Sequence, residues 1–170
     1  MNLKFWTWFS RAAAIKEKRK TFAGDGTWPF YVKREGADAV LVAIQGRQMI
    51  ATWFGGDNDP NDAGDTASGI KTRGNPNIMG CALPMNYTVH CKGSPIPKLP
   101  WNIPVTVSGR SHWTNEAKEL TVPLIDVGPN KRTGKTIDLT LAAFTKFAPL
   151  RQGNFIVAEI RIHGGARYFT

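Results

Sequence analysis

Two aspartates, Asp126 and Asp138, stand in apolar, strand-like surroundings. Asp126 lies in the run Leu-Ile-Asp-Val-Gly-Pro at 124–129, just before a Gly-Pro turn, and Asp138 lies in Thr-Ile-Asp-Leu-Thr at 136–140, just before a helical pattern. A buried carboxylate must be hydrogen-bonded or protonated. Two close carboxylates push their pKa values apart, and the one whose pKa is raised can act as a general acid near neutral pH. The spacing also fits a structural role, in which Asp138 caps a helix and Asp126 holds a turn.

His90 and the acidic segment 57–65 could also take part in chemistry. His90 would matter if the fold brought it near an aspartate, which could orient the ring and tune its pKa; otherwise it is structural. The acidic segment 57–65 spaces its oxygen ligands as a calcium loop does, but Asp62 stands where such a loop needs Gly and Ser68 where it needs a bidentate Glu. A polar, turn-rich loop is therefore the favoured interpretation.

Cys81 and Cys91 are the two cysteines of the chain, and no second Cys or His pair stands at zinc-ligand spacing. They could close a disulfide loop or remain as two buried thiols. We predict neither a metal nor a cofactor.

Aromatic residues lie beside the loops. Exposed aromatic rings could stack on sugar rings, although most aromatic residues of a β domain belong to its core. Phe54 is assigned to the core, and Trp53, Tyr87 and Trp101 could serve either purpose.

The elements that must position these residues are mostly short strands. Apolar runs of strand length, bounded by Gly, Pro, Asn or Asp, occur at 28–32, 39–44, 49–54, 78–83, 103–107, 120–127 and 155–162. Val105 and Val107 alternate with polar residues, as in a half-buried strand. One helix is expected after Asp138, with Thr140 as its cap and an apolar stripe to Ala148. A short helix is also expected from residue 1 to about 22.

The 170 residues carry a formal net charge of +9, much of it in the first twenty residues. This favours a basic N-terminal extension over residues 1–47, partly helical, that solvates the chain or contacts a protein partner or a polyanion. Nucleic acid is not favoured as a partner. No run approaches the ~20 apolar residues of a membrane span, and the N-terminus does not resemble a signal peptide.

Five segments, read in order, resemble motifs of the rare lipoprotein A and expansin families. They are Ala51–Gly56, Thr66–Gly69, Leu99–Val107, Asp126–Pro129 and Ile137–Phe144. The first resembles an opening strand that ends in aromatic residues and Gly, and the second resembles a Thr-Ala-Ser-Gly segment. The third resembles a Leu-Pro segment that leads into a strand. The fourth and fifth resemble the family segments Asp-Arg-Gly-Pro and Ile-Asp-Leu-Ser. The resemblance runs from about residue 48 to 163, which places a barrel domain at 48–170.

This resemblance implies a mainly β fold, a six-stranded double-psi β-barrel with one short helix after Asp138. It also implies that Asp126 and Asp138 approach each other across a surface groove. In lytic transglycosylases that share the barrel, an aspartate at one of these positions protonates the glycosidic oxygen, and the 6-hydroxyl of the sugar then attacks. In hydrolytic relatives a second carboxylate activates water. The sugar-binding residues expected on this basis are Trp53, Asp65, Ser68, Tyr87 and Trp101.

The chain departs from the family pattern at several positions. Gly55 and Gly56 stand where hydrolytic endoglucanases carry an Asp, and residues 70–73 supply no Asp after the Ala-Ser-Gly segment. Val127 replaces the Arg of Asp-Arg-Gly-Pro. His90 is the residue nearest to the family histidine, with an insertion between them. These departures argue against simple inverting hydrolysis.

Three hypotheses follow for a protein that faces a cell wall, whether extracellular, periplasmic or in a virion. The first is an enzyme of the lytic transglycosylase type that acts on peptidoglycan, with Asp126, Asp138 and His90 as catalytic candidates. The second is a non-catalytic module that binds or loosens wall glycans, as expansins do. The third is a structural or assembly protein, such as a phage virion component, that uses its N-terminal extension as a contact arm.

Overall fold

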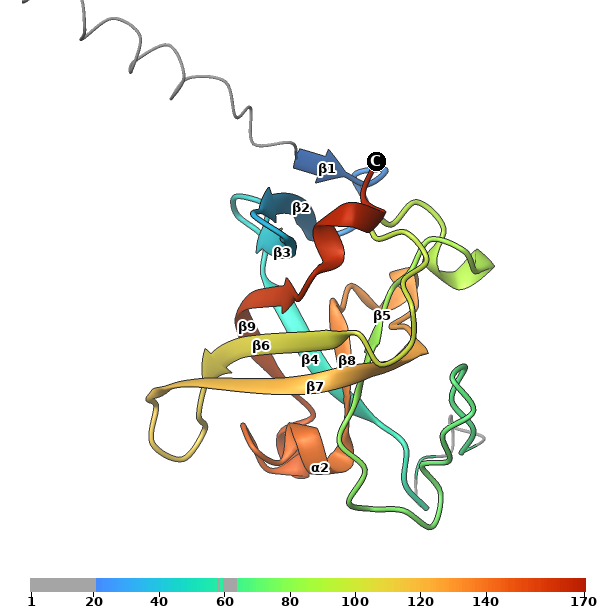
Figure 1. Ribbon diagram of the computed structural model, residues 1–170. Helices are drawn as coiled ribbons and strands as arrows, with labels where there is room; N and C mark the ends of the chain where they lie inside the picture. Colours follow the sequence, from blue (N-terminus) through green and yellow to red (C-terminus); the bar gives the residue numbers. More distant parts are fainter. Residues whose placement is uncertain (1–20, 58, 60–63) are drawn as a thin grey trace, which may run out of the picture.

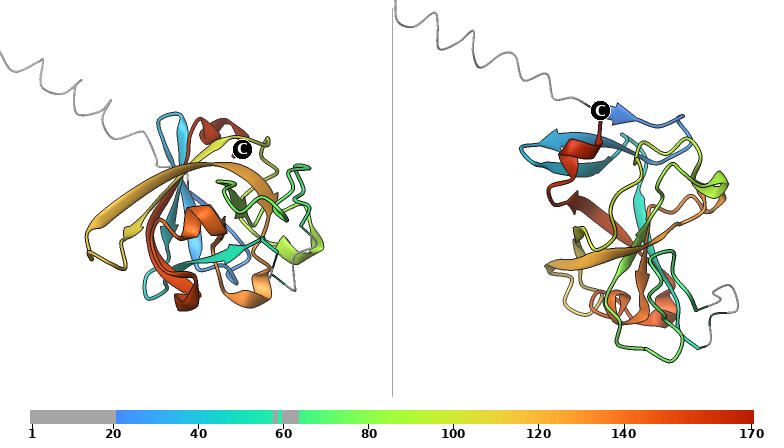
Figure 2. Two further views of the ribbon diagram at one scale, coloured as in Figure 1. Left: turned by 90° about the horizontal axis from the view of Figure 1, so that it is seen from below. Right: turned by 45° about the vertical axis from the view of Figure 1, so that its right-hand side comes forward.

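A closed ring of six strands organises the chain in the computed structural model, which describes residues 21–57, 59 and 64–170 (Figure 1). Around the ring the strands are β4 (Met49–Phe54), β8 (Ile137–Thr140), β5 (Cys81–Leu83), β7 (Ala117–Val127), β6 (Pro104–Arg110) and β9 (Asn154–Ile162), which pairs again with β4. The mainly β fold and the closed six-stranded barrel predicted from the sequence are therefore confirmed. Figure 2 shows the ring from its lower end.

Alternating side chains fill the interior of this barrel. Val105 and Val107 of β6 are fully buried while Thr106 between them is partly exposed, as the pattern predicts. Two of the pairings, β4 with β8 and β5 with β7, are parallel, and the remaining pairings of the ring are antiparallel. Parallel neighbours cannot be joined by a hairpin, so long connections cross the ends of the barrel. The candidate site lies beside these connections.

Three further strands extend the sheet beyond the ring. They are β1 (Thr21–Ala23), β2 (Phe30–Glu35) and β3 (Asp38–Ala43), and β3 pairs with β9. In Figure 1 they lie at the top of the barrel. The described part of the predicted extension is therefore strand, because Phe30, Val32 and Leu41 are buried against the core. Residues 1–20 of the predicted helix lie outside the described residues, whereas its predicted end, near residue 22, belongs to strand β1 instead. The boundary at residue 47 stays a prediction.

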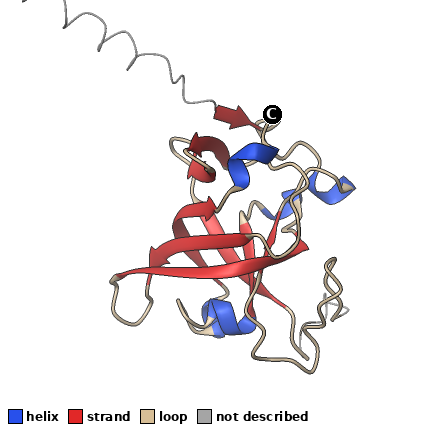
Figure 3. Cartoon of the chain, viewed as in Figure 1, coloured by secondary structure: helices blue, strands red, loops and turns tan. Residues whose placement is uncertain are grey.

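Helical segments are few and short (Figure 3). They are α2 (Leu141–Phe144) and the 3-10 turns η1 (Val89–Cys91), η2 (Lys131–Thr133), η3 (Leu150–Gln152) and η4 (Gly165–Tyr168). Helix α2 follows Asp138 as predicted but ends four residues before Ala148. None of the helices in the described part has the length and apolar character of a bilayer crossing.

The prediction that the Thr140 side chain caps the helix is wrong. Thr140 occupies the N-cap position, but its hydroxyl donates to the Ile78 carbonyl at 2.6 Å and accepts from the Gly80 amide at 3.1 Å. Ile78 and Gly80 belong to the segment before β5, so these hydrogen bonds turn the Thr140 hydroxyl away from the helix. Thr140 therefore ties β8 to the chain that enters β5.

Both cysteines are buried free thiols, so the disulfide alternative does not hold in this structure. Burial raises the pKa of both thiols. The thiols therefore act as small core groups.

The aromatic packing under α2 predicts a clear stability effect. Phe144 is fully buried, with its ring centroid 5.3 Å from that of Phe155. We expect Phe144→Ala to lower the free energy of unfolding by about 3–5 kcal/mol in urea titrations, because it leaves a cavity. Ile156→Ala is the matched control: this side chain is 56% exposed, and its loss should change stability by about 0.5 kcal/mol or less. Equal effects of the two substitutions would contradict the packing described.

Candidate functional site

Strand β5 brings Asp126 and Asp138 together. Its residue Ala82 is paired with Asp138 of β8 on one side and with Asp126 of β7 on the other. Two strand spacings place the two aspartate backbones about 10 Å apart, and both side chains line one cavity. The prediction from the resemblance that these carboxylates share a surface groove therefore agrees with their placement.

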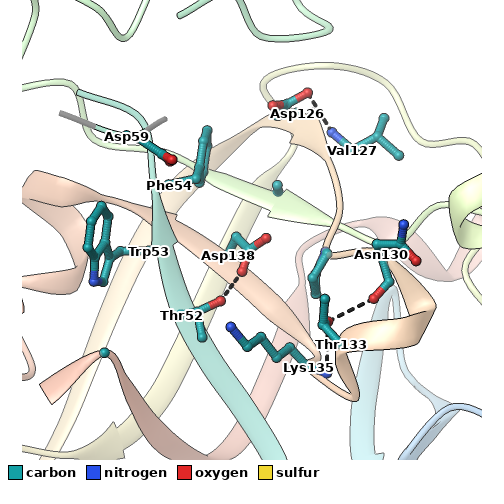
Figure 4. Close-up of a pocket in the computed structure, with 13 residues that line it drawn as sticks. Thr52, Trp53, Phe54, Asp59, Asp126, Val127, Asn130, Thr133, Lys135 and Asp138 are labelled. Atoms are coloured by element: carbon teal, nitrogen blue, oxygen red, sulfur yellow. Dashed lines mark hydrogen bonds between the residues drawn. The ribbon is translucent and has the colours of Figure 1, made fainter. Parts of the chain in front are cut away.

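The cavity has a volume of about 860 Å³. Its walls come from β4 (Thr52, Trp53 and Phe54), from the segment after β7 and from the approach to β8. Figure 4 shows Asp138 at the floor, with Thr52 and Lys135 beside it. The cavity thus combines carboxylates, hydroxyls, one ammonium group and aromatic rings.

Asp138 has a carboxyl whose pKa is strongly raised. Burial raises its pKa from 3.8 to about 6, a rise opposed by the Thr52 hydrogen bond and by the charge of Lys135 and assisted by the charges of Asp126 and Asp59. The parallel register of β4 and β8 sets Thr52 opposite Asp138, and the Thr52 hydroxyl donates to Oδ1. The other oxygen, Oδ2, faces Gly128: a Cβ built on that glycine would lie 3.6 Å from it, in ordinary van der Waals contact.

Asp126 is held by backbone amides. Its Oδ1 accepts from Val127 N at 2.8 Å and from Ala67 N at 2.9 Å, and the adjacent Ser68 amide donates to the Ile125 carbonyl at 3.1 Å. This carboxylate therefore fastens segment 66–69 to the end of β7. The two segments are far apart in the sequence, yet both belong to the motif set that resembles the barrel families.

Asp59 is a third carboxylate of the cavity, which sequence reasoning missed. Left-handed backbone at Gly55 and Gly56, with φ of +84° and +90°, turns the chain after β4, and the Gly55 amide donates to Asp59 Oδ2 at 3.2 Å. Asp59 therefore supplies a carboxylate close to Gly55 and Gly56, which stand where the hydrolytic endoglucanases carry an Asp. Its position in the acidic segment 57–65 is the available signal, but the sequence analysis interprets that segment as a polar, turn-rich loop or a calcium loop and not as part of a cavity.

The structure does not test the calcium alternative; among the described residues alone, no group of three His, Cys, Asp or Glu side chains could hold a metal ion. Asp57 instead accepts from the Gly74 amide at 2.8 Å. Asn58 and residues 60–63 of the segment lie outside the described residues.

His90 faces a second, smaller cavity of about 240 Å³, on the far side of the segment 127–130. Its Nδ1 lies 3.3 Å from Nδ2 of Asn130, a residue that lines both cavities. Within the described part of the chain, the imidazole makes no ion pair with a carboxylate at 4 Å or less. A catalytic role for His90 stays a prediction that this geometry does not favour.

Of the five predicted sugar-binding residues, Trp53 lines the cavity and the other four do not. Trp53 lines it, with its indole N–H donating to the Leu150 carbonyl at 3.2 Å. Tyr87 is 42% exposed, and burial together with the charge of Asp126 raises its pKa. Trp101 packs on the core, and Ser68 lies in the segment 66–69 that Asp126 holds. Asp65 is exposed, with its Oδ1 3.9 Å from the Lys71 Nζ. A role in binding sugar stays a prediction for all five.

Comparisons with known proteins leave the family open. Neither a protein-family model nor a curated protein matches the sequence. Among solved structures the chain is similar to the Streptomyces papain inhibitor, with 21% identity and a TM-score of 0.41, over 68% of this chain and 93% of that one. At this level the likeness carries no argument about function. The resemblance to rare lipoprotein A and expansins therefore stays a prediction.

The raised pKa of Asp138 predicts a pH-dependent stability. The folded state holds this proton more tightly than the unfolded state, whose carboxyl has the ordinary pKa of 3.8. The resulting stabilisation is present below about pH 4 and is lost as the pH rises through about 6, the folded value. We expect Asp138→Asn, which cannot ionise, to gain stability relative to wild type between pH 4.5 and 7.5, by about 2 kcal/mol. Urea unfolding at both pH values measures this change, and a stability difference that does not vary with pH would contradict the assignment.

Proposed function

We propose that the cavity binds a cell-wall polysaccharide and cleaves it, with Asp138 as the general acid. The observation that supports this most is a carboxyl group with a pKa of about 6 at the floor of an open cavity, flanked by two further carboxylates. A general acid works best when its pKa is near the working pH. Trp53 and Phe54 on the wall are suited to packing against a sugar ring.

The proposed step begins with Asp138 protonated on Oδ2. This proton passes to the glycosidic oxygen, the bond from that oxygen to C1 breaks, and the bonding electron pair stays with the oxygen of the leaving sugar. The negative charges of Asp126 and Asp59 stabilise the positive charge that develops on the ring. The 6-hydroxyl of the same sugar then attacks C1 and returns its proton to Asp138. The product is an anhydro end, and the carboxyl group is restored without a water molecule being consumed.

The reaction can be tested with purified peptidoglycan. Wild-type protein should release anhydro-ended fragments detectable by mass spectrometry, and Asp138→Asn should lower the rate by a factor of about 10²–10⁴, the usual value of a general acid. Asp59→Asn should have a smaller effect, because this residue stabilises charge from a distance. Absence of anhydro products, or an Asp138→Asn variant with the wild-type rate, would refute lytic cleavage. Products with reducing ends would instead indicate that Asp59 or Asp126 activates water.

A second candidate is a non-catalytic glycan-binding module, favoured by the state of Asp126. Its Oδ1 is occupied by two backbone amides, which suits a structural fastening better than a catalytic base. Sedimentation with insoluble peptidoglycan tests this function separately from cleavage. Retention of both wild type and Asp138→Asn, without any product from either, would favour the binding module. A protein that neither sediments nor cleaves would exclude both candidates.

A further inference from the structure

Lys135 is the one lysine that lines the described cavity. It follows Gly134, whose left-handed backbone (φ +68°) turns the chain back toward β8. The Lys135 amide donates to the Thr133 hydroxyl at 3.3 Å, and this hydroxyl donates to the Asn130 carbonyl at 2.7 Å. On the other side, Thr136 N donates to Ile50 O at 2.9 Å. The backbone that carries the ammonium group is therefore anchored at both ends.

The ammonium group has no ion-pair partner within 4 Å among the described residues, in contrast to Lys33, which pairs with Glu35. Figure 4 shows it extending across the cavity beside Thr52 and Asp138. Its charge does reach Asp138, because it lowers the pKa of that carboxyl against the effect of burial. A cation placed in this way can bind an anionic group that enters the cavity.

We propose that Lys135 is a specificity residue that binds a carboxylate on the sugar next to the cleaved bond, so that the cavity selects carboxylated glycans over neutral ones. This inference rests on the proposed function of the cavity. A carboxylate fits better than a phosphate group, because a doubly charged group would be repelled more strongly by Asp59, Asp126 and ionised Asp138.

Binding of such a carboxylate is coupled to the protonation of Asp138. The charged groups that face this carboxyl are Asp59 from the segment after β4, Asp126 from β7 and Lys135 from the approach to β8. Protonation of Asp138 removes one negative charge from the site of the incoming anion. The affinity for the carboxylated glycan should therefore be highest below about pH 6 and fall as the pH rises through that value. The same coupling favours the protonated acid when substrate is bound.

The test compares each glycan with its methyl ester, which has nearly the same shape but no charge. Two carboxylate sources are used: peptide-free peptidoglycan strands, whose lactyl groups carry the acid, and oligogalacturonate. Isothermal titration calorimetry is run at pH 5.5 on wild type, on Lys135→Gln and on Lys146→Gln, an exposed lysine outside the cavity. Circular dichroism of each variant confirms that it is folded.

We expect wild type and Lys146→Gln to bind the acid form of at least one glycan about tenfold more tightly than its ester. Lys135→Gln should bind the acid form no more tightly than the ester. The acid form should also lose affinity in wild type between pH 5.5 and 7.5 but not in Asp138→Asn. The source that is bound identifies the carboxylate as lactyl or uronic.

Two results would overturn the proposal: equal binding of acid and ester by wild type, or an acid preference that persists in Lys135→Gln. If both forms are also cleaved in an Asp138-dependent manner, the proposed function stands and only the specificity inference fails. If neither form of either glycan binds or is cleaved, both fail.

Discussion

The parallel pairing of β4 with β8 is the constraint on which the site depends. It sets Thr52 opposite Asp138, so that a hydroxyl from one strand engages one oxygen of the carboxyl on the next. Ile137 and Leu139, which flank Asp138 in β8, are fully buried, and the Asp138 side chain on the opposite face of the strand lines the cavity. Burial and the hydrogen bond act in opposite directions on the pKa, and burial is the larger effect. A proton is therefore retained at a pH where an exposed aspartate would have lost it.

Strand β5 positions Asp126 relative to Asp138. Because Ala82 is paired on both sides, the aspartates of β7 and β8 are held two strands apart and face the same opening. Asp126 then fastens the 66–69 loop through the Ala67 amide. The cavity is thus built from the ends of strands and from the connections that the parallel pairings require. Its walls include segments that are far apart in the sequence.

Much of the fold could be predicted from local patterns. Seven apolar runs correspond to strands β2 to β7 and β9 with boundary errors of a few residues, since alternation and bounding turn residues are local signals. Strand β8 was recognised only as strand-like surroundings of Asp138, and three-residue β1 was missed, because each is too short for a periodic signal. The helix after Asp138 was predicted too long: Phe147 and Ala148 are buried, but in turns that follow α2. Periodic burial does not distinguish a helix from a helical turn followed by a loop.

The sequence by itself determined the β class of this protein and the two apolar-flanked aspartates, because both follow from the order of residues within short segments. Tertiary structure decided which groups meet. Asp59 reaches the cavity through a glycine turn, Thr52 through a strand register and Lys135 through an anchored loop, whereas His90 lies behind the segment 127–130. These outcomes depend on pairing between distant strands, and no local pattern encodes that pairing. The pKa of Asp138 depends on it as well, since the burial of this carboxyl and the charges around it arise only when the barrel closes.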